Sequence, residues 1–264
     1  MDRKRLLQQV FRSCTSAPLL AATVALFCIF TGMPDALADE QLDLSGAVVA
    51  VRPGDLPNAE KAACTVLVEE IEKRTGIRLA TSSTWPEGGT VIALSSQPVV
   101  PEWGHDLPGT PETRSEGYRL VVDAKAATVW IVGADARGTL YGAGALVRKM
   151  SWAKGRASIP AELDIATAPA YPIRGHQLGF RTQANSWVAW TPEQFDQYIR
   201  ELALFGLNSV ENIPFQDSRQ TPLMKVDRRE MNRRMSEICA RYDLDYWVWT
   251  PADYDLNDAG ARAK

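Results

Sequence analysis

Histidine and cysteine are scarce in this chain, and a metal or redox centre built from them is not expected. There are 2 histidines and 4 cysteines among 264 residues. His105 and His176 are far apart in the sequence, and no cysteine lies in a Cys-x-x-Cys pair. Gly-x-Gly-x-x-Gly, P-loop and Ser-His-Asp patterns are also missing. We therefore predict neither a metal nor a cofactor.

The chain also lacks an excess of basic residues. Its formal net charge is -3 and its pI is near 5.6. Such a chain has no extended positive surface to attract phosphate groups. Nucleic acid and anionic lipid are thus unfavourable partners, whereas a neutral ligand is compatible with this composition.

Residues 1–38 have the pattern of a secretory signal, which predicts an exported protein in the periplasm or outside the cell. The pattern consists of the basic residues Arg3, Lys4, Arg5 and Arg12, an apolar run over 19–31, and the small-residue site Ala36-Leu37-Ala38. An uncleaved membrane anchor is the alternative, but the run is shorter than the ~20 residues of a spanning helix. After cleavage we expect no membrane contact. Cys64 and Cys239 then remain, as free thiols or as one disulfide.

The most readable stretch is residues 116–146, EGYRLVVDAKAATVWIVGADARGTLYGAGAL. Two runs rich in Val, Ile, Tyr and Trp predict a β-hairpin. Asp135 is a suitable N-cap for the helix that follows. Glycines within that helix lower its intrinsic propensity by roughly 1 kcal/mol each, so Gly138, Gly142 and Gly144 suggest close backbone packing.

An α+β domain is predicted over residues 39–168. Around the hairpin we expect a strand at 42–53, a helix from Pro57 to Gly76, a strand at 90–94, a loop at 95–115 and a strand at 162–166. A sheet with helices on one face accommodates this order. The acidic residues of the first helix, among them Glu69 and Glu70, are expected on its solvated face.

The pattern changes in residues 169–264, where strands alternate with helices. Strands are expected at 173–181, 207–214 and 245–251, with helices opened by Thr191 and Asp227. A βαβαβ order predicts parallel strands, as at the start of a (β/α)8 barrel. About 90 residues follow the linker, against about 250 in a whole barrel. The predicted fold class is therefore α/β: a small α+β domain followed by an incomplete (β/α)8 barrel.

Three segments resemble a known family. EGYRLVV, VWIVGADARGTLYGAGAL and PIRGHQLGFR are similar to the N-terminal portion of bacterial glycoside hydrolases of the beta-N-acetylhexosaminidase type, family 20, which are related also to alpha-glucuronidases. The resemblance covers residues 46–251. It implies a hexosaminidase-like domain before a catalytic barrel, and an oligosaccharide or polysaccharide as the ligand.

The resemblance carries one site residue directly, since the family's first-strand arginine, here Arg174, binds sugar hydroxyls. A structural ion pair at the base of the barrel is the alternative for Arg174. Gly179 stands where the family usually has aspartate, and Glu211, Asn212 and Ile213 stand in place of its His-Trp-His run. The family's Asp-Glu acid pair follows the fourth barrel strand, whereas this chain ends after the third. We therefore assign no catalytic residue and expect a chain truncated within the barrel.

Further ligand contacts are predicted where barrel enzymes place their sites, at the carboxyl ends of the strands. Asn185 and Trp187 fall in the first βα loop, and Glu211 lies near the end of the second strand. Glu211 could face Asp253 or Asp255, although solvated loop acids are the simpler interpretation. Trp187, Trp190, Trp247 and Trp249 could stack on sugar rings.

These observations lead to three hypotheses of function. The first is the N-terminal part of a secreted glycoside hydrolase, which is inactive as an isolated chain and has the missing remainder of the barrel as a possible partner. The second is a non-catalytic exported glycan-binding or scaffold module. The third is a small intact enzyme that uses Glu211 and Asp253.

Overall fold

The computed structural model describes residues 40–108, 114–178, 186–212 and 226–248. All of them belong to one compact unit, residues 40–264, which continues across the predicted boundary between residues 168 and 169. That boundary stays a prediction. The predicted signal at residues 1–38 lies outside the described residues.

The described residues form an α/β structure with three separate sheets. Its strands are β1 (Gln41–Asp43), β2 (Val48–Val51), β3 (Ala80–Ser82), β4 (Val91–Ser95), β5 (Tyr118–Asp123), β6 (Thr128–Gly133), β7 (Ser151–Ala153), β8 (Arg156–Pro160), β9 (Asp164–Thr167), β10 (Gly175–Gln177), β11 (Ser209–Asn212) and β12 (Asp245–Val248). Its helices are α2 (Asn58–Thr75), α3 (Ala136–Lys149), α4 (Pro192–Leu204) and α5 (Arg228–Arg241), with short 3-10 helices η2 (Pro101–Trp103) and η3 (Ser186–Ala189).

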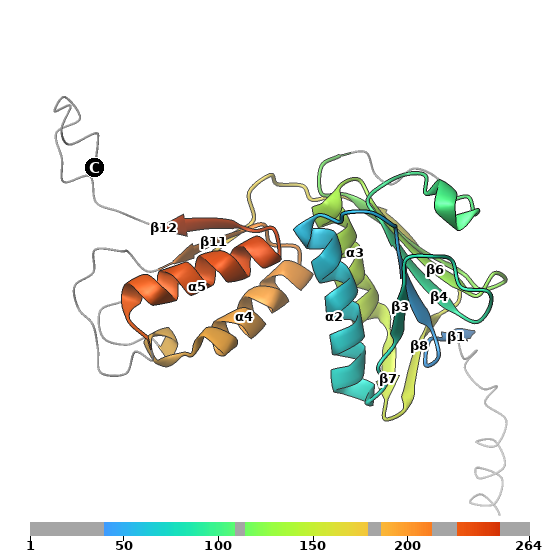
Figure 1. The fold of residues 1–264 in the computed structure, drawn as a ribbon, viewed down its shortest axis with the longest axis horizontal. Helices are drawn as coiled ribbons and strands as arrows, with labels where there is room; N and C mark the ends of the chain where they lie inside the picture. The colour runs from blue at the N-terminus through green and yellow to red at the C-terminus, as the bar shows by residue number, and fades with distance from the viewer. Residues whose placement is uncertain (1–39, 109–113, 179–185, 213–225, 249–264) are drawn as a thin grey trace, which may run out of the picture. The chain divides into compact units, whose positions relative to one another are not determined.

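The largest sheet is mixed and has the order β3-β2-β4-β6-β5-β9. β5 runs antiparallel to both β6 and β9, while β2 is parallel to β3 and β4. Figure 1 shows α2 and α3 together on one side of this sheet. Along β4, Ile92 and Leu94 face the core that contains these helices, and Val91 and Ala93 face a smaller core on the other side. The predicted hairpin, and helices covering one face, are confirmed.

Helix α3 begins where the sequence predicts. The Asp135 carboxylate accepts a hydrogen bond from the Gly138 N–H at 2.8 Å, as an N-cap should. Its other oxygen accepts from the Glu116 N–H at 2.8 Å. One aspartate therefore caps the helix and also holds the chain just before β5.

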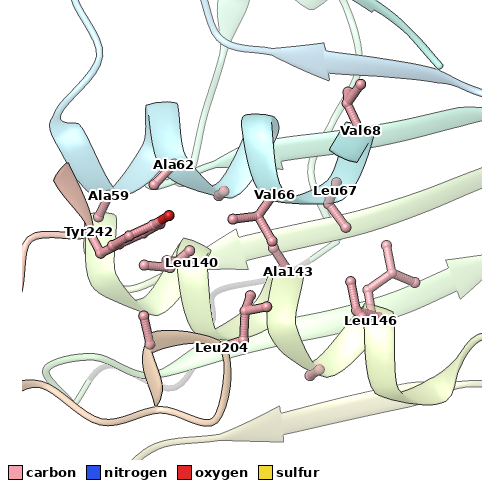
Figure 2. Close-up of a cluster of buried hydrophobic side chains, with 14 of the residues drawn as sticks. Ala59, Ala62, Val66, Leu67, Val68, Leu140, Ala143, Leu146, Leu204 and Tyr242 are labelled. Atoms are coloured by element: carbon pink, nitrogen blue, oxygen red, sulfur yellow. The ribbon is translucent and has the colours of Figure 1, made fainter. Parts of the chain in front are cut away.

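The glycines of α3 allow close packing, as predicted. A Cβ at Gly142 would lie 2.5 Å from the Cγ2 atom of Ile131 in β6, and one at Gly144 would overlap the carbonyl group of Leu204 in α4. Figure 2 shows Leu204 among the buried side chains of α2 and α3. Helix α3 therefore contacts the sheet, α2 and α4 at once.

The third sheet is parallel, in the order β10-β11-β12, as the βαβαβ pattern predicts. Thr191 opens α4 with a capping box to Gln194, and Asp227 caps α5 through the Glu230 N–H at 3.0 Å. A closed barrel is not formed by the part of the chain that the structure describes.

The prediction of one strand over 42–53 is wrong. The Asp43 carboxylate accepts hydrogen bonds from the Ser45 N–H at 2.9 Å and the Ser45 hydroxyl at 2.6 Å, which stabilises a turn. The chain therefore divides into β1, which pairs with β8, and β2, which enters the large sheet. Strands β3, β7 and β8 and the helix η2 inside the expected loop were not anticipated.

The expectation that Glu70 is solvated is also wrong. Glu70 is buried, and its carboxylate forms ion pairs with Arg74 and with the Nε atom of Arg200, at 3.1 Å from the latter. Arg200 belongs to α4 and also pairs with Glu69. The charged side of α2 thus contacts α4. The buried Glu70 is tolerated there because two arginines compensate its negative charge.

Cys64 and Cys239 are free thiols, which settles the choice left open by the sequence. Burial raises the pKa of both, that of Cys239 to about 12. Neither is therefore a reactive thiolate at neutral pH. None of the helices in the described ranges is both long and apolar enough to cross a membrane.

Replacing Gly144 by alanine should destabilise the fold by about 1 to 3 kcal/mol, because the new methyl group would overlap the Leu204 carbonyl. Urea denaturation followed by circular dichroism would measure the change. Gly46→Ala is the matched control, since a Cβ at Gly46 would meet no atom within 4 Å. Equal unfolding midpoints for the two variants would contradict the close approach.

Candidate functional site

The parallel sheet has one covered face and one open face. Register places Gln177, Glu211 and Trp247 side by side on β10, β11 and β12. Residues one position earlier, such as Val210, point the other way, into the core with α4 and α5. Figure 1 shows these two helices together on one side of the strands. The Gln177–Glu211–Trp247 row therefore lies on the face that no described helix covers.

A hollow of about 290 Å³ lies along this row. It is lined by Ile173, Gly175, His176, Gln177, Ser209, Glu211 and Trp247. Trp247 is 58% exposed, whereas Glu211 is half-buried. An indole beside a carboxylate and an amide suits a ligand with apolar C–H faces and hydroxyl groups, because the ring offers stacking and the polar groups offer hydrogen bonds.

A buried polar cluster lies behind the row. The Asn212 amide donates to the Tyr246 hydroxyl oxygen at 2.7 Å and to the Asn232 side-chain oxygen at 3.2 Å. The Tyr246 hydroxyl itself donates to the same Asn232 oxygen at 2.5 Å. Burial raises the pKa of Tyr246, so the hydroxyl stays a donor at neutral pH. This cluster joins β11, β12 and α5 and fixes the strands that carry Glu211 and Trp247.

Trp187 lies in a separate aromatic group. Its ring meets those of His176 and Trp190 edge-on, each with centroids 6.2 Å apart. His176 Nε2 lies 2.9 Å from the Tyr198 hydroxyl. This group packs beside α4, and Trp187 is not part of the described lining of the hollow. Asn185, Trp249, Asp253 and Asp255 lie outside the described residues.

Arg174 is engaged by groups of the protein itself. Its Nε donates to the Gly206 carbonyl at 2.6 Å, its Nη1 to the Tyr171 carbonyl at 2.8 Å, and its Nη2 to Glu116 at 2.5 Å. The residue directly precedes β10, at the end of the sheet opposite the strands' carboxyl ends. These contacts favour the structural ion pair over the sugar contact as the role of Arg174.

The Glu116 carboxylate is the centre of that ion-pair network. It pairs with Arg174 and with Arg137 of α3, and it accepts a hydrogen bond from the Asn208 amide at 3.2 Å. Glu116 is 8% exposed and has φ 63, in the left-handed region. A non-glycine residue in this region costs on the order of 1 kcal/mol, which the ion pairs offset.

Arg137 extends the network to β12. Its Nη2 donates to Asp245 at 2.9 Å, and its Nε lies 3.4 Å from Asp243. Burial alone would lower the pKa of Arg137, but hydrogen bonds to Asp245 and Glu116 outweigh that effect and raise it. The guanidinium therefore remains charged and links α3 to the parallel sheet.

Residues 36–165 match the family model "Glycosyl hydrolase family 20, domain 2". This part of the chain is thus similar to the second domain of family 20 glycosyl hydrolases, and we call it the family 20 domain. The match contains the hairpin, α2, α3 and the large sheet up to the first half of its edge strand β9, and it ends ten residues before β10 begins at Gly175. No curated protein sequence matches the chain.

Solved structures of glycoside hydrolases share the fold. CpGH84B has 16% identity and a TM-score of 0.56, with 86% of this chain and 37% of that chain covered. A GH20 exo beta-N-acetylglucosaminidase from Vibrio harveyi, in complex with N-acetylglucosamine, has 14% identity and a TM-score of 0.54, with 79% and 33% covered. The GH115 4-O-methyl-alpha-glucuronidase BtGH115A has 15% identity and a TM-score of 0.55, with 80% and 30% covered.

These likenesses extend past the family 20 domain. Coverage of 79% to 86% of this chain cannot be reached without residues after 165. Part of the chain beyond residue 165 therefore also resembles these folds. The chain spans about a third of the length of each of these structures. Within the described ranges, no three His, Cys, Asp or Glu side chains gather in a way that could hold a metal ion.

Replacing Arg174 by alanine should lower the free energy of unfolding by about 2 to 3 kcal/mol, since Glu116 would lose a buried charged partner. Chemical denaturation would measure this loss. Arg78→Ala is the control, because Arg78 and Glu72 form an exposed pair that contributes about 1 kcal/mol or less. Unchanged stability together with weaker sugar binding would instead support a ligand role for Arg174.

Proposed function

We propose that this chain is the N-terminal part of an exported glycoside hydrolase that acts on glycans, with the parallel sheet as the first three βα units of a (β/α)8 barrel. The observation that carries this is the open face of β10, β11 and β12. Parallel sheets are normally covered on both faces, and in a barrel the second face is the interior. The family 20 domain and the likeness to a solved structure of a glycoside hydrolase support the same assignment.

The Gln177–Glu211–Trp247 row would then line the sugar site. Trp247 would stack on the apolar face of a sugar ring, and Glu211 and Gln177 would bind its hydroxyl groups. N-acetylglucosamine is the first ligand to test, because the similar Vibrio harveyi enzyme was solved in complex with it. Glu211 here is a binding residue, not one of a catalytic pair.

Glycoside hydrolysis generally requires two carboxyl groups placed across the scissile bond. Within the described lining of the hollow, Glu211 is the one carboxylate. We therefore propose that the chain by itself binds sugar without cleaving it, and that catalysis requires further barrel strands. The non-catalytic glycan-binding module stays as the alternative function, since both share this behaviour in the isolated chain.

Export is the remaining part of the proposal, and it is supported by the basic start, apolar run and small-residue site within residues 1–38. A periplasmic or extracellular location would bring the sugar site to glycans outside the cell.

The purified chain should bind N-acetylglucosamine in isothermal titration calorimetry and should not hydrolyse a 4-nitrophenyl N-acetyl-beta-glucosaminide. Trp247→Ala should weaken binding by about 0.5 to 1.5 kcal/mol, a factor of about 2 to 12, because the stacking contact is lost. Phe205→Ala is the control, since Phe205 is 68% exposed but lies outside the hollow.

Two outcomes would contradict this assignment. If Trp247→Ala leaves sugar binding unchanged, the open face is not the sugar site. Hydrolysis by the chain, abolished in Glu211→Gln, would show a small intact enzyme instead of a binding part.

Expression in a Gram-negative host should yield a periplasmic protein whose first residue is Asp39, because cleavage is expected after Ala38. Cell fractionation and N-terminal sequencing measure this. A variant with Arg3, Lys4 and Arg5 changed to glutamate should stay unprocessed. An uncleaved protein in the membrane fraction would favour the anchor interpretation.

A further inference from the structure

A second hollow lies on the family 20 domain itself. Its volume is about 920 Å³, within the roughly 300 to 1,000 Å³ that is typical of small-molecule sites. It opens beside β5, β6 and residues 105–108, and its lining includes Trp85, Trp130, His105 and Val121. Trp130 belongs to the small core on the sheet face away from α2 and α3, and the partly buried Val121 packs against that core.

Aromatic rings form one wall of this groove. The Trp85 ring stacks on the Trp130 ring with centroids 5.2 Å apart, and the His105 ring lies 4.3 Å from that of Trp85. Trp130 is 6% exposed and is anchored in β6, whereas Trp85 is half-buried and His105 is exposed. The wall is therefore rigid at its base, and its outer rings are accessible to a ligand.

Carboxylates occupy the rim. The side chains of Glu40, Asp106 and Glu162 line the groove, and among the described residues these carboxylates have neither a hydrogen-bond donor nor a cationic partner. Asp123 is the fourth carboxylate in the lining, and it accepts a hydrogen bond from the Ala126 N–H at 3.0 Å. Among the described lining residues, Lys125 is the one lysine or arginine. The groove thus offers several free hydrogen-bond acceptors beside aromatic rings.

We propose that this groove is a second, non-catalytic site that binds an uncharged oligosaccharide. Sugar rings have apolar C–H faces that pack on aromatic side chains, and hydroxyl groups that donate to carboxylates. The carboxylate rim repels uronic acids and phosphates, which selects a neutral glycan over an anionic one. The choice of a glycan rests on the proposed function, but the groove is separate from the open face of the parallel sheet.

Such a site would hold a polymeric substrate on the family 20 domain while another part of the same polymer occupies the open face. Two weak sites on one chain increase the overall affinity for a long ligand, because the second contact becomes intramolecular. The groove therefore distinguishes long from short glycans, a property that the open face alone does not have.

The test is calorimetric titration of the full 264-residue chain with the neutral hexamer of N-acetylglucosamine. Trp85→Ala should weaken binding by a factor of about 2 to 12, as expected for Trp247→Ala at the other site, because the accessible indole is lost. Asp106→Asn and Glu162→Gln should each weaken it severalfold, and these two exposed positions are not part of the apolar cores. Glu102→Gln, an exposed carboxylate outside the groove, is the matched control and should have no effect.

Ligand charge provides an independent check. Binding of the neutral hexamer should change little between 0.05 and 0.5 M salt, since no ligand charge is screened. Tighter binding of an oligogalacturonate, or binding of a glucosamine oligomer but not its N-acetylated form, would overturn the assignment of an uncharged ligand.

Variants of the two sites separate this proposal from the proposed function. Hexamer binding that survives Trp85→Ala but is lost in Trp247→Ala would contradict sugar binding in the groove and support sugar binding on the open face. The reverse result would support sugar binding in the groove and contradict the open face as a sugar site. No heat from any neutral oligosaccharide would overturn both.

Discussion

The buried carboxylate of Glu116 connects the two kinds of structure in this chain. It lies among Arg137 of α3, Arg174 before β10 and Asn208 before β11, so one negative charge is shared by the family 20 domain and the parallel sheet. A carboxylate in such a place is tolerated only while its cationic partners stay in position, because the alternative is an uncompensated buried charge. The apolar contacts between α3 and α4 bury surface area. They define the relative position of the two helices less strictly than these directed hydrogen bonds do.

The long elements could be predicted because their signals are redundant. Helix α4 has a threonine cap, a proline at its first position and an apolar stripe, and each indicates the same start. Strands of three residues, such as β3 and β7, contain too few positions for alternation to appear. The division between β1 and β2 depends on the Asp43 side chain binding Ser45, a local interaction that the continuous apolar run conceals.

The candidate site was predictable in part. Glu211 could be placed near a strand end from topology alone, whereas the exposure of Trp247 depends on which residues of β12 face the helices. The role of Arg174 could not be read from its motif, because its partners Glu116, Tyr171 and Gly206 come together only in the folded chain. The aromatic groove was missed for the same reason, since Trp85, His105 and Trp130 belong to three separate segments.

The β5–β6 hairpin and α3 are contiguous in sequence, and this has a kinetic consequence. Their contacts close short loops, whereas Gln41 of β1 and Ser158 of β8 are 117 residues apart. Loop-closure entropy increases with that separation, and chains whose contacts are local fold faster. During synthesis the hairpin and α3 can therefore assemble before β8 has left the ribosome, and β1 must wait for its partner. The segment on which the sequence resemblance rests is thus also one that can start folding early.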